Sequence, residues 1–185
     1  MKALTEKHIA VFRRHMVDVI GIHAELSSDE IGKSQLDERL MAMIREVPRH
    51  LFVPAPVAAA AYEDMPLPIG FDKTISQPFM VALMTDLLDP QPHDCVLEVG
   101  TGLGYQTAIL ARLVAQVWSV EIVEEFVESA QNRLKHVGVE PLTFELARAR
   151  AAGLSTRLTI RFSWRRPRRK SRRRCSPSSS RAGGW

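Results

Sequence analysis

The chain has 185 residues, 45% of them hydrophobic and 25% charged, a composition typical of one globular domain of ordinary size. The first twenty residues are interrupted by Arg13, Arg14 and Asp18, so we expect neither a signal peptide nor a membrane span. Only two cysteines, Cys95 and Cys175, are present, which implies no disulfide framework and favours a cytoplasmic location. We expect Cys95 to be an inert core thiol.

The net charge of +4 is unevenly distributed along the chain. Residues 1–140 carry 12 Lys and Arg against 20 Asp and Glu, a net charge of −8. Residues 141–185 carry 13 Lys and Arg against one acid, Glu145, a net charge of +12. A change this abrupt predicts a boundary, beyond which the arginine-rich composition is typical of a disordered tail.

The first predicted elements are helices. Apolar residues recur at steps of three and four over residues 5–26 and again over 34–47, where Pro48 ends the second helix. The proline-rich residues 50–70 are predicted to be irregular, apart from one helical turn at 57–62.

A third helix begins at Pro78 and ends before Asp89-Pro90. A regular alternation of strands and helices then follows. Short apolar runs predict strands at 95–99 and 116–121, and helices are predicted at 105–114 and 124–136. This order predicts a Rossmann-like, doubly wound α/β fold, incomplete on its C-terminal side and preceded by a helical segment. We divide the chain into an N-terminal helical segment at 1–76, a cofactor-binding core at 77–146 and a basic tail at 147–185.

The stretch VLEVGTGLGYQTAILA, residues 96–111, places three glycines where a strand passes into a helix. In a dinucleotide fingerprint, G-x-G-x-x-G, the third glycine lets the helix approach a pyrophosphate closely. Here Gly100 and Gly102 match, but Tyr105 occupies the third position, which argues against a pyrophosphate. The sequence also contains no phosphate-binding G-x-x-x-x-G-K-[ST] loop.

Two acids flank this turn. Glu98 precedes it and Glu121 ends the next predicted strand, where a carboxylate can accept both hydroxyls of a ribose. An acidic, glycine-lined site suits a positively charged nucleoside, and S-adenosyl-L-methionine fits this description. The alternative is that the glycines only form the turn and that Glu121 is a solvated helix cap.

Four segments resemble the protein-L-isoaspartate O-methyltransferases: VPRHLFVP (47–54), MPLPIG (65–70), TISQPFMVALMTDLL (74–88) and VLEVGTGLGYQTAILA. The resemblance covers about residues 10–140. It implies methyl transfer from S-adenosyl-L-methionine to the free carboxylate of L-isoaspartyl residues in damaged proteins, a repair reaction. Ser76 matches the family's catalytic serine. The residues that match its cofactor site are Thr74, Ile75, Glu98, Gly100, Thr101, Gly102 and Glu121.

The chemistry implied by this resemblance needs little from the protein. A carboxylate acceptor, with a pKa of about 4, is already ionised at neutral pH, so no general base is required. The Ser76 hydroxyl is expected to orient the acceptor, although spacing alone favours Ser76 as a helix N-cap before Pro78. The six histidines show no metal-ligand spacing, so no metal is expected.

The expected partners are isoaspartyl proteins and peptides, acted on by a monomer, without a membrane and without nucleic acid. The resemblance ends where TFEL (143–146) is the expected start of a third strand. Later, residues 157–164 alternate as a strand does and are a candidate to cover the free edge of strand 95–99. One alternative is an inactive truncated or frame-shifted fragment whose basic tail binds nucleic acid non-specifically. Another is a methyltransferase for a different acceptor.

Overall fold

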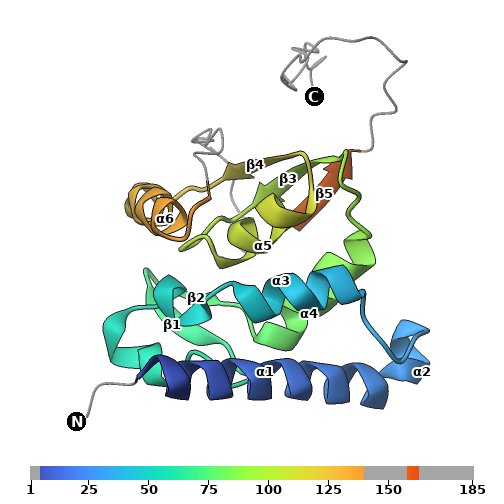
Figure 1. Ribbon diagram of the computed structural model, residues 1–185. Coiled ribbons are helices and arrows are strands. Elements are labelled where there is room, and N and C mark those ends of the chain that lie inside the picture. Colours follow the sequence, from blue (N-terminus) through green and yellow to red (C-terminus); the bar gives the residue numbers. More distant parts are fainter. Residues whose placement is uncertain (1–4, 140–157, 163–185) are drawn as a thin grey trace.

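The computed structural model describes residues 5–139 and 158–162, and Figure 1 shows their arrangement. The N-terminal half contains mainly helices: α1 (Glu6–Leu26), α2 (Ser28–Ile31), α3 (Glu38–Glu46), the 3₁₀ helices η1 (Arg49–Phe52) and η2 (Ala55–Ala60), and α4 (Pro78–Leu88). A hairpin of β1 (Leu67–Gly70) and β2 (Lys73–Ile75) precedes α4. The second half contains β3 (Cys95–Val99), α5 (Tyr105–Leu113), β4 (Gln116–Val120), α6 (Glu124–His136) and β5 (Leu158–Phe162).

The predicted helices are found, and one of their boundaries differs from the prediction by more than one residue. α3 begins at Glu38 rather than at residue 34, because Asp37 caps it: its side chain accepts a hydrogen bond from the Leu40 N–H at 2.9 Å. The backbone N–H of Asp37 donates to Asp86 Oδ1 of α4 at 2.7 Å. This tertiary contact fixes the start of the helix, so periodicity alone placed it four residues too early.

The β1–β2 hairpin was missed by the sequence analysis, which predicted an irregular segment. Leu67 pairs with Ile75 and Pro68 with Thr74 in an antiparallel ladder. The turn uses positive φ values at Phe71 (51°) and Asp72 (55°), a geometry that suits the twist of a hairpin. Nearby, the helical turn predicted at 57–62 is the 3₁₀ helix η2, which begins two residues earlier.

The main sheet has the strand order β4–β3–β5. β3 and β4 are parallel, with Cys95 opposite Gln116, and α5 provides the crossover between them. β5 pairs antiparallel with β3 and covers its other edge, so the prediction for this edge is confirmed. In Figure 1 the N-terminal helices lie along one side of this sheet, with α5 between the sheet and α3.

One hydrophobic core joins the two halves of the chain. Its buried members come from α1, α3, η1, the hairpin, α4, α5 and α6; they include Met16, Ile20, Leu40, Ile44, Phe52, Ile75, Val81, Tyr105, Ile109, Phe126 and Leu134. Arg133 of α6 also donates to the carbonyl oxygens of Leu51 and Val53. The core therefore holds the N-terminal half against α6 and against α5, the helix that follows the glycine turn at residues 100–104. The division of the chain at residue 76 stays a prediction.

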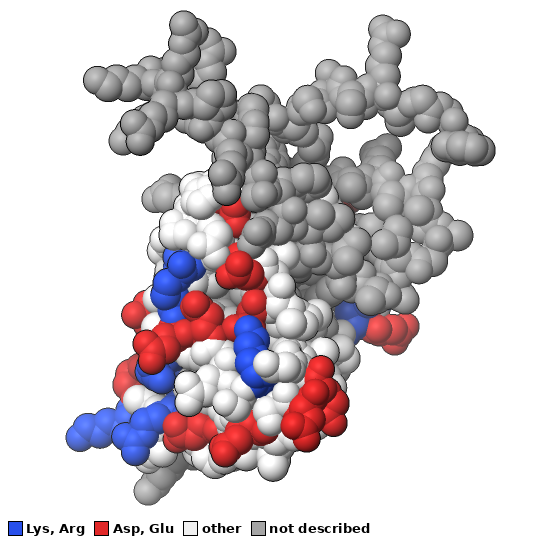
Figure 2. Space-filling model, turned by 90° about the vertical axis from the view of Figure 1, so that its right-hand side faces the viewer, with Lys and Arg blue, Asp and Glu red and all other residues white. Residues whose placement is uncertain are grey.

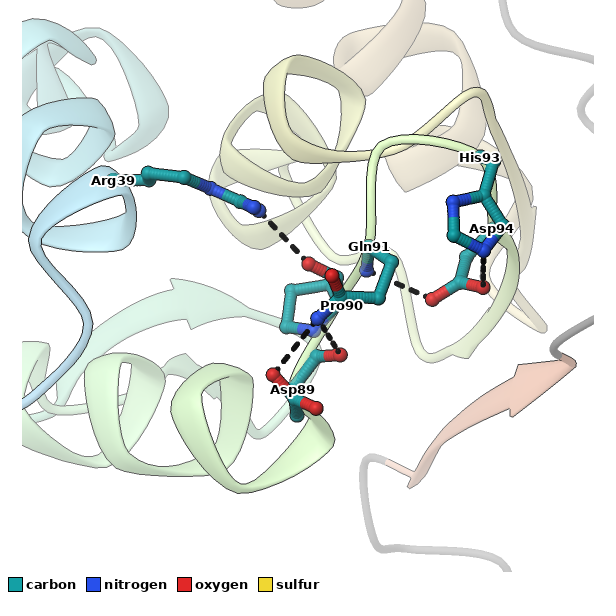
Figure 3. Close-up of polar contacts among 6 residues, drawn as sticks. All are labelled: Arg39, Asp89, Pro90, Gln91, His93 and Asp94. Carbon is teal, nitrogen blue, oxygen red and sulfur yellow. Dashed lines mark hydrogen bonds and ion pairs between the residues drawn. The ribbon is translucent and has the colours of Figure 1, made fainter.

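The loop between α4 and β3 is fixed by hydrogen bonds within and beyond itself (Figure 3). The Gln91 N–H donates to Asp94 Oδ2 at 2.8 Å, and its side-chain amide donates to Asp89 Oδ1 at 2.9 Å. Arg39 of α3 donates to the Pro90 carbonyl oxygen at 2.9 Å. Cys95, where β3 begins, is disulfide-bonded, so the predictions of an inert core thiol and of a chain without disulfides are wrong.

A pocket of about 300 Å³ opens between α3, the end of α4 and this loop. It contains none of the predicted site residues. Its lining residues are Lys33, Gln35, Leu36, Asp37, Arg39, Leu40, Asp86, Asp89, Pro90 and Leu113.

Two predictions lie outside the described residues: the third strand at 143–146 and the basic tail at 147–185, except for β5. Among the helices of the described residues, none has the length and apolar character needed to cross a membrane.

Candidate functional site

The glycine turn follows β3 and is anchored to the end of the neighbouring strand. The N–H groups of Gly100 and Thr101 donate to the carbonyl oxygen of Val120, at 2.8 and 3.3 Å. Gly102 and Gly104 have φ values of 56° and 93°, which favour glycine, and Gly104 caps the start of α5. The turn therefore lies at the carboxyl ends of two parallel strands, where α/β folds bind their ligands.

The carboxylate of Glu121 lies directly against this turn. Glu121 Oε2 accepts a hydrogen bond from the Gly102 N–H at 2.7 Å. Glu121 Oε1 accepts from the N–H groups of Ile122 and Val123, at 2.8 and 3.1 Å. The residue is only 7% exposed, so it is not a solvated cap. Both oxygens are instead held in place between the turn and the start of α6.

Glu98 has a different environment from Glu121. It is 1% exposed, and its Oε2 accepts from Thr107 Oγ1 at 2.5 Å and from Ser119 Oγ at 2.6 Å. The Ser119 hydroxyl also bonds to that of Thr101 at 2.5 Å. This network joins β3, β4, α5 and the turn. Glu98 therefore supports the turn from the protein interior, and a direct contact between Glu98 and a cofactor stays a prediction.

The segment Thr74–Ser76 ends β2 and leads into α4. Thr74 is exposed, Ile75 is buried and Ser76 is half-buried. The N-cap of α4 is Gln77, so the interpretation of Ser76 as the cap is wrong. Asp64 bonds to the first turn instead: its carboxylate accepts from the Phe79 N–H and from Gln77 Nε2, both at 2.8 Å.

Sequence reasoning assigned no role to Arg49. This side chain is fully buried; Nη2 donates to the Ser76 carbonyl oxygen at 2.7 Å and Nε to that of Ala61 at 2.8 Å. Its guanidinium carbon lies 4.8 Å from the ring centroid of Tyr105, the first residue of α5. The signal was present, because Arg49 belongs to the VPRHLFVP segment, but the sequence does not reveal its contacts.

In the structure the predicted site residues therefore lie in two groups. Gly100, Thr101, Gly102 and Glu121 share one hydrogen-bonded turn, and Glu98 supports it. Thr74, Ile75 and Ser76 form the second group, and Arg49 bridges it to the helix that follows the turn. A second bridge is aromatic: Phe71, at the tip of the hairpin, meets Phe126 of α6 edge to face, with ring centroids 5.3 Å apart.

The part of the chain that holds these groups carries a net negative charge. Residues 5–139 carry 11 Lys and Arg against 19 Asp and Glu. Figure 2 shows one face on which acidic and basic side chains are interspersed over the described part of the surface. A net negative charge favours a cationic ligand over a phosphate-bearing one. Among the described residues, no group of three or more His, Cys, Asp and Glu side chains could hold a metal ion.

Curated relatives cover most of this chain. It is 51% identical over 135 residues to protein-L-isoaspartate O-methyltransferase 1 of Polaromonas sp. strain JS666, covering 73% of this chain and 57% of the relative. It is 53% identical over 128 residues to protein-L-isoaspartate O-methyltransferase 2 of Syntrophobacter fumaroxidans, covering 69% of this chain and 52% of the relative. The chain therefore spans about half the length of the curated relatives that it matches.

Solved structures agree with the fold. A protein-L-isoaspartate O-methyltransferase matches with a TM-score of 0.59 and 26% identity, over 72% of this chain and 41% of its own. A beta-aspartate methyltransferase from Plasmodium falciparum, in complex with S-adenosyl-L-homocysteine, matches with a TM-score of 0.55 and 21% identity, over 72% of this chain and 61% of its own. The predicted Rossmann-like fold is confirmed.

The family model for protein-L-isoaspartate(D-aspartate) O-methyltransferase matches residues 23–153. This range holds α3, α5 and α6, the Ser76 segment, and both strands that position Glu98 and Glu121. The chain belongs to the protein-L-isoaspartate(D-aspartate) O-methyltransferase family.

Proposed function

We propose that this chain transfers a methyl group from S-adenosyl-L-methionine to the free carboxylate of L-isoaspartyl residues in damaged proteins. Membership of the family and the names of its relatives support this reaction. The observation that carries the proposal is the buried Glu121 carboxylate, held against the Gly102 N–H at the end of β4. A carboxylate is the acceptor that a pair of ribose hydroxyls requires, and a glycine turn leaves room for a ligand to approach the backbone.

The residues of the turn fit such a cofactor. Glu121 would hold the ribose, with Gly100, Thr101 and Gly102 beside it and Glu98 behind the turn. The net negative charge of residues 5–139 suits the positively charged sulfonium of the cofactor. The Plasmodium falciparum structure, which is in complex with S-adenosyl-L-homocysteine, supports a cofactor of this class but not the individual residue roles. Thr74 and Ile75 belong to the same proposed site.

The protein's contribution to the reaction is alignment. Bound S-adenosyl-L-methionine supplies a methyl group on a positively charged sulfur, which an ionised carboxylate can attack in line without a base. Ser76 would donate its hydroxyl hydrogen bond to the acceptor carboxylate and orient it. Burial of the surrounding turn restricts the access of water.

The direct test is transfer of radiolabelled methyl groups to a peptide that contains one isoaspartyl residue. The matched control is the same peptide with a normal aspartyl residue, and a Gly102→Val variant of the full chain provides the second control. We expect label on the isoaspartyl peptide only, and loss of labelling in the variant. No labelling, together with no saturable heat on titration with S-adenosyl-L-methionine, would overturn the proposal.

In the same assay, methyl label on the aspartyl peptide alone would identify a methyltransferase for a different acceptor.

The proposal includes a monomer in the cytoplasm. The oligomeric state can be checked by light scattering and the location by cell fractionation.

A second candidate function rests on charge. Residues 141–185 carry a net charge of +12, and Lys and Arg side chains bind nucleic acid by releasing its counterions. The second candidate is therefore an inactive core with a tail that binds nucleic acid non-specifically. Salt-dependent binding of RNA or DNA without any S-adenosyl-L-methionine binding would favour it. Residues 5–139 carry 19 acids against 11 bases, and this net negative charge favours binding of the cationic methyl donor over binding of nucleic acid.

A further inference from the structure

Arg49 is a fully buried side chain in contact with three separate parts of the chain. It lies in η1, and two of its hydrogen bonds go to backbone carbonyl oxygens. One is that of Ala61, at 2.8 Å from Nε, and the other is that of Ser76, at 2.7 Å from Nη2. A planar guanidinium can make both bonds at once because its N–H groups lie in a fixed fork.

The third contact is with the helix that follows the glycine turn. The Arg49 guanidinium carbon lies 4.8 Å from the centroid of the Tyr105 ring. Burial raises the pKa of Tyr105 to about 12, so the phenol is neutral at physiological pH and the contact is cation–π in character. Tyr105 directly follows Gly104, the N-cap of α5, so Arg49 contacts the residue next to the glycine turn.

The Ser76 segment is held from its other side as well. Asp64 accepts hydrogen bonds from Gln77 Nε2 and from the Phe79 N–H, both at 2.8 Å, and pairs with His23 Nδ1 at 2.7 Å. Asp64 therefore restrains the residues after Ser76, but none of these three contacts involves a residue of α5. The contacts of Arg49, in contrast, join Ser76 directly to the helix that begins at the turn.

We propose that Arg49 is a positioning residue that sets the placement of Ser76 relative to the glycine turn. The inference rests on the proposed function, in which these two groups hold the methyl acceptor and the methyl donor. An in-line displacement is sensitive to such placement: an error of about 1 Å can lower the rate about 100-fold. Arg49 touches neither reactant in this scheme, and acts through the Ser76 backbone and the Tyr105 ring.

The test compares two variants of Arg49 in the full chain. Arg49→Lys keeps the positive charge but replaces the planar fork with a single point charge, and Arg49→Met removes both. We expect Arg49→Lys to lower kcat for an isoaspartyl peptide about 10- to 100-fold, while the Kd for S-adenosyl-L-methionine changes less than about threefold. Arg49→Met is expected to lower kcat at least as much.

The matched control is Arg112→Met. Arg112 lies on α5 and, like Arg49, donates to two backbone carbonyl oxygens: that of Ala108 at 2.7 Å and that of Val137 at 2.9 Å. Neither contact reaches Ser76. We expect kcat of Arg112→Met to stay within about twofold of the parent chain when both are assayed below their melting temperatures. Equal kcat losses in the two single-site Met variants would overturn the positioning role.

A second measurement needs no catalysis. We expect backbone amide hydrogen exchange to become faster in Arg49→Met over both 73–79 and 104–110, with the centre of α1 unchanged. Faster exchange confined to 49–61, or an unchanged kcat in Arg49→Lys, would overturn the inference. A parent chain that neither binds nor methylates would refute the proposed function separately, because the exchange pattern still decides whether Arg49 couples the two segments.

Discussion

Gly104→Ala is the substitution whose effect follows most directly from the structure. Gly104 has a φ of +93°, and a Cβ at this position would lie 3.3 Å from Leu134 Cγ and 3.5 Å from Ala130 Cβ. Both neighbours belong to α6 and to the hydrophobic core. An alanine would therefore meet two costs: an unfavourable backbone conformation and a contact that requires the Leu134 side chain to move by a few tenths of an ångström.

The magnitude is the sum of these two effects. A non-glycine residue in the left-handed region costs about 1–2 kcal/mol, and a mild steric conflict in a packed core adds up to about 1 kcal/mol more. We expect the free energy of unfolding to fall by about 1–3 kcal/mol. In a chain of this size that corresponds to a melting temperature about 2–12 °C lower.

The assay is urea denaturation followed by circular dichroism, and the chain supplies a control with the opposite sign. Gly21 lies inside α1, is exposed, and has open space where the Cβ of an alanine would lie, with no atom within 4 Å. Gly21→Ala should therefore raise the free energy of unfolding by up to about 1 kcal/mol, the difference in helix propensity. If Gly104→Ala were as stable as the parent, or if both variants shifted equally, the reasoning from φ and packing would be refuted.

Three further predictions concern the site and its support. Ser76→Ala should lower turnover far more than affinity for S-adenosyl-L-methionine, measured by steady-state kinetics and calorimetry; equal losses would contradict an acceptor-orienting role. Asp64→Ala should lower the free energy of unfolding by about 1–2 kcal/mol in urea, since the Phe79 N–H loses its acceptor, and Asp64→Asn should lower it less. Burial, reinforced by Arg13, lowers the pKa of His50 below 6.5. The unfolded state then binds more protons, so this stabilising contribution is complete above pH 6.5 and is lost as the pH falls through the lowered pKa; His50→Gln should flatten that slope in pH-dependent melts.

Elements with a strong local pattern were predictable from the sequence. The strands at 95–99 and 116–120 are short apolar runs, and α5 and α6 were placed to within about one residue. The boundary of α3 was not, because Asp86, 49 positions further along the chain, accepts the hydrogen bond that sets its start. The β1–β2 hairpin was also missed, since its turn uses Phe71 and Asp72 at positive φ instead of the usual Asn-Gly or Asp-Gly.

The sequence by itself determined the glycine turn, the two flanking acids and the family resemblance, because each depends on residue types at short, fixed spacing. Only the tertiary structure separated the two acids: Glu121 meets the Gly102 N–H, whereas Glu98 is held in the interior by Thr107 and Ser119. It alone showed Arg49 reaching the Ser76 carbonyl oxygen across 27 positions. Such contacts join distant segments that a shared core brings together, and no local pattern encodes which carbonyl oxygen a buried guanidinium will meet.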